Sequence, residues 1–518
     1  MVSQKWTSAY DYAASSGYFF KTKEGLPYNY SYLATSDFQV SQVDFTNPKA
    51  VDWYQQQLDV VIEAGFKGWM YDFGEYTPHD SVSYDGHDGL YMHNLFPLQY
   101  QKACFDHLVD VFGTPHSDYA PDFVFYVRSG YLGSQRVTWA HWTGDPSADW
   151  NKASGLPAQL VAMLNIGISG MPYSGSDIGG FAWYVDPPPT MELWARWTQL
   201  GCFSGLMHEQ GSGTGRGPKT HIFDTAEGTR IWRKYAKLRT QLSLYIYYAA
   251  HQARESGTPI MRHHILTYPR DPKAMEQEYQ YMFGEGILVA PVIEKGVTKL
   301  SVYLPVIEDL SNNWVEFFAS SKYIEKDGSF RIGFKEYLKG GTTVEVDAPV
   351  DNIPIFVRAG YIIITTDPRV QTLSPAKNSS VKTFQSMSHI RHVWAWPMRE
   401  NDFIASGRLH DDSMYMLYYG KIDNCICEFI AFNTPKNITH VVQIAGPWIV
   451  KPNGVQTEGG EIKLPKASSV QDLLSKVDNS TVSEWFFDDE MNTMWIKLTP
   501  PLFDVFVMGS MDRDIGMN

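Results

Sequence analysis

The chain has 518 residues, of which 44% are hydrophobic and 14% aromatic, and it carries a formal net charge of -14. This length accommodates several domains with cores of their own, and the negative charge argues against nucleic acid as a partner. No run of about 18 apolar residues occurs, so the sequence predicts no membrane span. The 4 cysteines show no C-x-x-C spacing. We therefore expect no metal site and no cofactor.

The start of the chain shows no secretory signal, because Met1 is not followed by a charged and then apolar stretch. N-x-S/T sequons are present, and they would be used only in a secreted chain. A secreted or lysosomal location would therefore require a signal upstream of Met1. The sequence leaves the compartment and the oligomeric state open.

Taken in order, the first clear element is a helix that enters at Asn47 as cap and Pro48 in the first turn and runs to about Ala64. It leads into the short apolar stretch 65–72, which predicts a buried parallel strand ending at Asp72. An acid at the carboxyl end of such a strand is typical of catalysis in α/β enzymes. The alternative is that Asp72 caps the following helix.

Further elements repeat this alternation of strands and helices. Predicted helices cover Pro97–Phe112, Leu156–Leu164, a segment through Trp194–Trp197, and one long helix from about Thr229 to Glu255, while residues 123–130 form a strand. The pattern predicts a parallel α/β barrel or a doubly wound sheet over residues 1–278. From Tyr279 onward, short strands separated by Gly, Pro, Asn and Asp predict a β-sandwich over 279–369 and a β-rich domain over 370–518.

Acids stand at several of the predicted strand ends: Asp72, Asp145 and Asp177, with Arg128 and His208 in the same setting. Glycosidic hydrolysis needs two carboxyl groups, one for the anomeric carbon and one to protonate the leaving oxygen. The aromatic residues beside these acids are Trp69, Tyr71, Trp142 and Trp150. Such rings would offer stacking faces and a partly dry pocket that raises the pKa of the proton donor.

Six motifs occur together in one order. They are Val43-Asp44-Phe45-Thr46-Asn47-Pro48, Gly68-Trp69-Met70-Tyr71-Asp72-Phe73-Gly74-Glu75-Tyr76, Val127-Arg128-Ser129-Gly130, Trp142-Thr143-Gly144-Asp145, Ser176-Asp177-Ile178-Gly179-Gly180 and Val357-Arg358-Ala359-Gly360. With them the chain resembles glycoside hydrolase family 31, the retaining α-glucosidase, α-xylosidase and sulfoquinovosidase group, over roughly residues 15–420. A weaker match, residues 406–412, is similar to the family's second C-terminal sandwich. The resemblance implies a (β/α)8-type barrel followed by two C-terminal β-sandwich domains.

By this resemblance Asp72 is the nucleophile and Asp145 the general acid/base, while Arg128, Asp177 and His208 bind the sugar of the cleaved subsite. Each sugar-binding residue also has a structural interpretation. Arg128 could pair with a neighbouring acid, and Asp177 could be a turn residue before two glycines. His208 lacks the arginine that some relatives place just before it.

Three aromatic residues complete the predicted substrate site: Trp69, Trp142 and Phe181. Phe181 follows Asp177-Ile178-Gly179-Gly180, where sulfoquinovosidases carry a tyrosine that helps hold the sulfonate. Phenylalanine has no hydroxyl to donate. An α-glucoside is therefore the first expected substrate, with a sulfoquinovoside or α-xyloside as alternatives. A non-catalytic carbohydrate-binding relative is the competing class, and a metal-dependent hydrolase is disfavoured because no histidine pair has ligand spacing near the acids.

The chain departs from the family in length. Only 71 residues precede Asp72, too few for an N-terminal sandwich and three strand–helix units of about 30 residues each. Segments around 17–21 and 39–45 offer at most one or two further strands. We therefore expect a barrel that is incomplete at its N-terminal side, in a chain that is a fragment, a truncated gene model or one that needs another chain.

Overall fold

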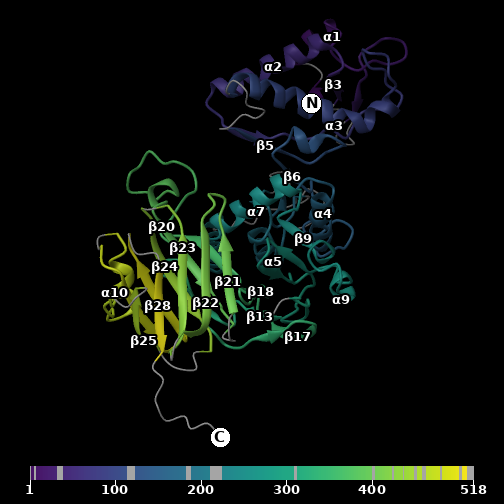
Figure 1. The fold of residues 1–518 in the computed structure, drawn as a ribbon. Helices are drawn as coiled ribbons and strands as arrows, with labels where there is room; N and C mark the ends of the chain where they lie inside the picture. Colours follow the sequence, from purple (N-terminus) through teal and green to yellow (C-terminus); the bar gives the residue numbers. More distant parts are fainter. Residues whose placement is uncertain are drawn as a thin grey trace. The chain divides into compact units, whose positions relative to one another are not determined.

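The computed structural model describes residues 2–4, 7–31, 39–113, 123–181, 188–210, 224–308, 312–398, 403–422, 425–435, 437–447, 452–457, 462–478, 481–500 and 504–509 (Figure 1). The chain divides into two compact units, Met1–Gly144 and Asp145–Asn518.

The first unit contains two small sheets. Its strands are β1 (Val2–Gln4), β2 (Tyr30–Ser31), β3 (Gln39–Gln42), β4 (Gly68–Met70), β5 (Val124–Val127) and β6 (Ala140–Trp142). Strands β1, β3 and β2 pair antiparallel, whereas β4, β5 and β6 pair parallel in chain order. The segments 17–21 and 39–45 therefore supply no parallel strand, because β3 pairs antiparallel with β1 and β2 and Phe19 forms an antiparallel bridge with Val43.

The helices of the first unit are α1 (Ser8–Ser15), α2 (Pro48–Glu63), α3 (Gly89–Phe112) and the short 3-10 turn η1 (Ser134–Arg136). Helix α2 confirms the predicted start, since the Asn47 side chain accepts a hydrogen bond from the Lys49 amide. The predicted start of the next helix at Pro97 is wrong. Helix α3 begins eight residues earlier, where Asp88 caps it by accepting from the Tyr91 amide, and Pro97 lies inside the helix.

An aromatic core in this unit fixes the end of strand β4. Tyr71 stacks on Tyr100 of α3 with ring centroids 3.9 Å apart. The Tyr100 hydroxyl donates to the backbone carbonyl of Asp72 at 3.0 Å, and the Tyr71 hydroxyl donates to the carbonyl of Tyr100 at 3.1 Å. Both rings are almost fully buried. The backbone that carries Asp72 is therefore held by packing and by two hydrogen bonds.

The second unit begins with the remaining strand–helix alternation. Strands β7 (Ser174–Asp177) and β8 (Leu206–His208) pair parallel. The helices are α4 (Leu156–Ile168), α5 (Met191–Cys202), α6 (Ala226–Gln241), α7 (Ser243–Ser256), α8 (His264–Thr267), α9 (Pro272–Met275), η2 (Gln385–Met387) and α10 (Val470–Ser475). The single long helix predicted over 229–255 is two helices, α6 and α7, with a turn at Leu242. Leu242 is buried, so the position of the break follows packing rather than a glycine or proline.

The rest of the second unit is built from β-sheets (Figure 1). One six-stranded sheet has the order β16-β13-β18-β11-β10-β9, with β12–β17 and β14–β15 as separate pairs. Two five-stranded sheets follow, in the orders β19-β20-β24-β27-β26 and β21-β22-β23-β28-β25. Their pairs are antiparallel except β20 with β24.

The strands of the first of these groups are β9 (Met261–His263), β10 (Tyr281–Phe283), β11 (Ile287–Val289), β12 (Lys299–Leu304), β13 (Asn313–Glu316), β14 (Ser321–Ile324), β15 (Ser329–Ile332), β16 (Leu338–Lys339), β17 (Thr342–Asp347) and β18 (Ile355–Arg358). Those of the five-stranded sheets are β19 (Ile362–Thr366), β20 (Ile390–Ala395), β21 (Phe403–Arg408), β22 (Met414–Ile422), β23 (Cys425–Asn433), β24 (Thr439–Ala445), β25 (Pro452–Thr457), β26 (Glu484–Asp488), β27 (Thr493–Leu498) and β28 (Asp504–Gly509). The predicted class, part of an α/β barrel followed by two β-sandwich regions, is confirmed. The boundaries predicted at 278/279 and 369/370 stay predictions.

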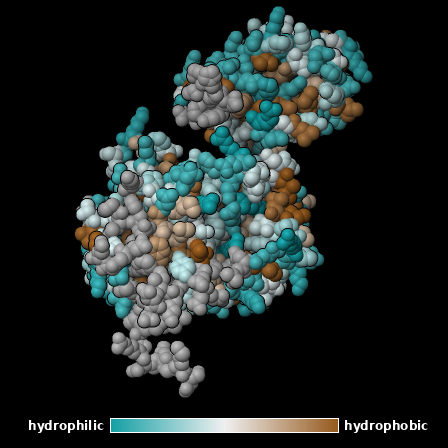
Figure 2. All heavy atoms as spheres, in the orientation of Figure 1, coloured by the Kyte–Doolittle hydropathy of each residue, from teal (hydrophilic) through white to brown (hydrophobic). Residues whose placement is uncertain are grey.

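Hydrophobic side chains reach the surface of both units in separate patches (Figure 2), and the large exposed ones include Leu90 and Leu132 in the first unit and Leu266 and Leu373 in the second. None of the helices in the described ranges combines the length and the apolar composition needed to cross a membrane.

Candidate active site

Asp72 lies just after strand β4 and does not cap a helix, because the next helix is α3 and its cap is Asp88. The Asp72 carboxylate instead accepts a hydrogen bond from the amide of Phe73 at 2.7 Å. Phe73 and Gly74 both have positive φ, 70° and 121°. A side chain at position 74 would meet the Ser129 hydroxyl at 2.4 Å, so the glycine is needed for this sharp turn. A non-glycine residue in that conformation is strained, and such strain gathers at functional sites.

Arg128, just after β5, holds three groups of the Asp72 segment. Its Nη1 lies 3.3 Å from the Asp72 carboxylate. Its Nε donates to Glu75 at 2.6 Å, and its Nη2 also pairs with Glu75 and donates to the Tyr76 hydroxyl at 3.1 Å. The guanidinium also lies over the Phe73 ring, 4.9 Å from its centroid. The expectation that Arg128 pairs with a neighbouring acid is therefore met within the first unit, and one of its partners is Asp72.

Asp145 is the first residue of the second unit and follows Gly144, which has a φ of 81°. A Cβ atom added at Gly144 would lie 3.6 Å from Cδ of Arg128. The chain immediately before Asp145 thus passes beside the arginine that contacts Asp72. On the C-terminal side of Asp145, the carbonyl of Pro146 accepts a hydrogen bond from the amide of Phe181 at 2.9 Å. The segments that carry Asp145 and Phe181 are therefore tied together.

Asp177 is the last residue of β7, and it faces His208 at the end of β8 in the strand register. The Nε2 atom of His208 lies 2.7 Å from the Asp177 carboxylate. Asp177 is completely buried, and its backbone carbonyl also accepts the Gly180 amide at 3.0 Å. Asp177 thus ends a strand and opens a turn, and its side chain pairs with the partly buried His208.

The two tryptophans of the predicted site make internal contacts. Trp69 packs edge-on against Phe123 with centroids 4.6 Å apart, and Trp142 packs edge-on against Tyr126 at 5.3 Å. Trp142 is only 1% exposed, whereas Trp69 is partly exposed. Beside Trp142, burial lowers the pKa of His141 to about 4. These contacts favour a packing role for Trp142. Phe181 is partly exposed, so its ring is more accessible than that of Trp142.

Sequence reasoning assigned no role to Glu75 and Tyr76, although both stand in the Asp72 motif. The structure brings them together with Arg128, from which Glu75 is separated by 53 positions. Their presence in one short motif with Asp72 was the only available signal. Within the described ranges, no group of three or more His, Cys, Asp and Glu side chains is placed to hold a metal ion.

Comparison with known proteins identifies the family of the chain. The domain described as "Glycosyl hydrolases family 31 TIM-barrel domain" matches residues 1–249, and the "Glycosyl hydrolase family 31 C-terminal domain" matches residues 257–363. The chain therefore belongs to glycosyl hydrolase family 31.

Among its relatives, the sulfoquinovosidase of Escherichia coli K12 is 31% identical over 348 residues, which cover 67% of this chain and 47% of that protein. The human neutral alpha-glucosidase C is 28% identical over 375 residues, 69% of this chain and 36% of that protein. The chain thus spans about half or less of the length of these relatives. A family 31 dextranase from Flavobacterium johnsoniae, complexed with glucose, has the same fold, with a TM-score of 0.74, 22% identity, and coverage of 96% of this chain and 60% of the dextranase.

Proposed function

We propose that this chain carries the catalytic residues of a retaining α-glycosidase that acts on α-glucosides, with Asp72 as nucleophile and Asp145 as general acid/base. The observation that carries the proposal is the environment of Asp72. Its carboxylate stands at a strand end on a strained turn, beside the Arg128 guanidinium and a backbone amide. Contact with a cation and a donor favours the ionised carboxylate, which is the form that attacks an anomeric carbon.

In the first step, a carboxylate oxygen of Asp72 forms a bond to the anomeric carbon while the bond from that carbon to the leaving oxygen breaks. Asp145 gives its proton to the leaving oxygen, which departs as an alcohol. In the second step, Asp145 takes a proton from water, and the hydroxide attacks the anomeric carbon and releases Asp72. Two inversions give net retention.

The sugar of the cleaved subsite would be held by Arg128, Asp177 and His208. Arg128 has a planar set of donors and is fixed by Glu75, so its guanidinium is oriented before any sugar arrives. The Asp177–His208 pair offers a buried acceptor next to a ring that can donate or accept. The hydroxyl groups of a sugar both donate and accept hydrogen bonds, so a site that offers donors and acceptors together suits them.

The preference for a glucoside rests on Phe181. A sulfonate needs donors, and the phenylalanine ring supplies none. Sulfoquinovosides form the second candidate substrate, which is favoured by the similarity to the sulfoquinovosidase of E. coli. α-Xylosides are the third, since a fungal relative from Emericella nidulans, 29% identical over 348 residues, is an alpha-xylosidase.

The test compares aryl α-glucosides with good and poor leaving groups in two variants. Asp72→Asn should abolish turnover of both substrates, because covalent attack is lost. Asp145→Asn should slow the poor leaving group far more than the good one, because only the poor one needs the proton. Equal losses on both substrates in both variants would contradict these roles. Binding of glucosides without turnover by the unsubstituted chain would support a non-catalytic carbohydrate-binding protein instead.

A further inference from the structure

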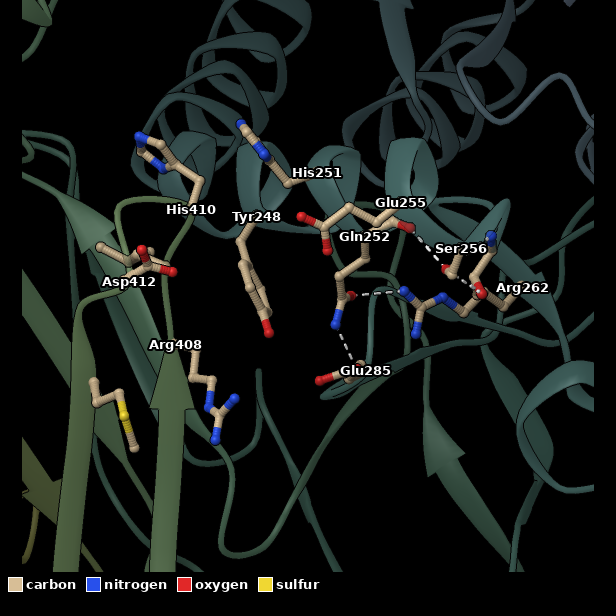
Figure 3. A pocket seen from close by; sticks show the side chains of 13 residues that line it. Tyr248, His251, Gln252, Glu255, Ser256, Arg262, Glu285, Arg408, His410 and Asp412 are labelled. Carbon is tan, nitrogen blue, oxygen red and sulfur yellow. Dashed lines mark hydrogen bonds between the residues drawn. The ribbon is translucent and has the colours of Figure 1, made fainter.

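A polar cavity lies in the second unit, beside helix α7, and none of the proposed catalytic residues line it. Its volume is about 450 Å³, within the usual range for small-molecule sites. Four segments supply its walls: α7, the end of strand β9, the turn between β10 and β11, and the end of β21 with the loop that follows (Figure 3). That last loop is part of the 406–412 motif, to which the proposed catalysis gives no role.

The floor of this cavity is fixed by a chain of hydrogen bonds. Arg262 is 5% exposed and donates to the Gln252 side chain at 2.9 Å and to the carbonyl of Pro259 at 2.9 Å. Gln252 in turn donates to the Glu285 carboxylate at 2.5 Å (Figure 3). Glu285 stands between Gly284 and Gly286, and a side chain at either glycine would lie 2.4 Å from a tyrosine ring or its hydroxyl. The Glu285 carboxylate is therefore held in place before a ligand binds.

Tyr248 and Arg408 face the Glu285 carboxylate of this floor and can donate further hydrogen bonds. Figure 3 shows the Tyr248 hydroxyl, the Arg408 guanidinium and the Glu285 carboxylate directed toward one space. Among the described residues, the guanidinium of Arg408 has no hydrogen bond or ion pair, and the residue is exposed. Burial and the nearby Glu285 raise the pKa of Tyr248, which keeps its hydroxyl protonated and able to donate. Glu285 thus supplies an acceptor that faces two donors, Tyr248 and Arg408, and Arg408 does not contact Glu285.

The charges around the cavity identify the class of ligand. Carboxylates of Glu255, Glu285 and Asp412 alternate with the guanidiniums of Arg262 and Arg408. An anion would meet the carboxylates and a cation would meet the guanidiniums, so neither is favoured. A neutral molecule with adjacent hydroxyls can accept from Arg408 and Tyr248 and donate to Glu285. We propose that this cavity is a second saccharide-binding site, separate from the catalytic residues and independent of the proposed hydrolysis.

The rim of the cavity adds flat faces to these polar groups. His251 and His410 line it and stack on each other with centroids 5.4 Å apart and an interplanar angle of 27°. Tyr247 packs edge-on against His410 at 4.4 Å. Burial lowers the pKa of His410, so its ring is neutral near pH 7. A neutral ring at the edge of a polar cavity suits the apolar face of a sugar.

The experiment measures binding of maltose by ligand-observed NMR to the full chain carrying Asp72→Asn and Arg128→Ala. This background removes turnover and one proposed sugar contact, so a failure of the catalytic proposal does not affect the result. We expect saturable binding in this background, and a dissociation constant raised about tenfold or more by Arg408→Ala or Glu285→Gln, since each removes a charged hydrogen-bond partner.

Arg254→Ala is the matched control, because Arg254 is, like Arg408, an exposed arginine, and it lies on α7 without lining the cavity. It should leave maltose binding unchanged. Glucose 6-phosphate and glucosamine serve as charged probes and should bind more weakly than glucose. The proposal would be overturned if the background chain did not bind maltose. It would also be overturned if Arg408→Ala and Arg254→Ala bound maltose equally well, or if the chain preferred a charged probe.

Discussion

Arg196 offers a direct test of how the barrel portion is joined to the β-sheets of the second unit. It lies on α5, is 2% exposed, and burial lowers its pKa. Its guanidinium donates to the carbonyls of Ala348 at 2.6 Å, Asn352 at 2.8 Å, Pro349 at 3.0 Å and Val297 at 3.1 Å, and to the Gln199 side chain at 3.3 Å. The perturbation is Arg196→Met, which keeps an unbranched side chain and removes every donor.

The magnitude follows from the burial of the acceptors. The bonds to Ala348 and Gln199 are fully buried, whereas the other three are only partly buried. Water can replace the guanidinium at the partly buried carbonyls, but the two buried acceptors lose their donor at a cost of about 1–3 kcal/mol each. We therefore expect the free energy of unfolding to fall by about 2–6 kcal/mol. Arg196→Lys should lower the free energy of unfolding by roughly half as much, because an ammonium can still reach some of the acceptors.

The assay is urea unfolding of the full chain followed by tryptophan fluorescence, with Trp194 and Trp197 as neighbouring reporters on α5. Arg270→Met is the control, because Arg270 is 83% exposed and pairs with Glu308 at the surface, where an ion pair contributes little. Unfolding of Arg196→Met at the same urea concentration as the unsubstituted chain would refute the reasoning. So would an equal shift in Arg270→Met.

Three further predictions concern the candidate site and the buried core. Glu75→Gln should lower kcat/KM on an aryl α-glucoside by roughly 5–30-fold, because Glu75 orients Arg128 and is itself 37% exposed. The control Glu63→Gln, at the exposed end of α2, should leave kcat/KM unchanged. Phe181→Tyr should raise the ratio of sulfoquinovoside to glucoside hydrolysis by about tenfold through one added donor, and an unchanged ratio would remove Phe181 from the specificity argument. Burial lowers the pKa of His264 from 6.5 to about 3, so its contribution to stability is complete above pH 6.5 and is lost as the pH falls toward 3. Thermal unfolding of His264→Phe should therefore depend less on pH across this range, and equal slopes would contradict it.

Part of the fold could be read from local patterns. Asn47 and Pro48 start α2 because a cap and a proline act within one turn of the backbone. The short apolar runs before Asp72 and Arg128 are the strands β4 and β5. Strand β7 before Asp177 has the sequence Ser-Gly-Ser-Asp and is buried throughout, so no apolar run marks it. The same local patterns predict the wrong start for α3. Pro97 lies inside this helix, but in the sequence it resembles a proline of the first turn, and the residue that caps the helix is Asp88.

The sequence by itself determined the acids at the strand ends and the family to which they belong, since those signals lie within single motifs. Only the tertiary structure decided what each charged side chain contacts. Arg128 meets Glu75 because parallel pairing of β4 with β5 brings together residues that are 53 positions apart. Arg408 and Glu285 come to one cavity because β21 and the β10–β11 turn both lie against α7. Such contacts depend on strand pairing and packing between distant segments, and these leave no mark in the spacing of neighbouring residues.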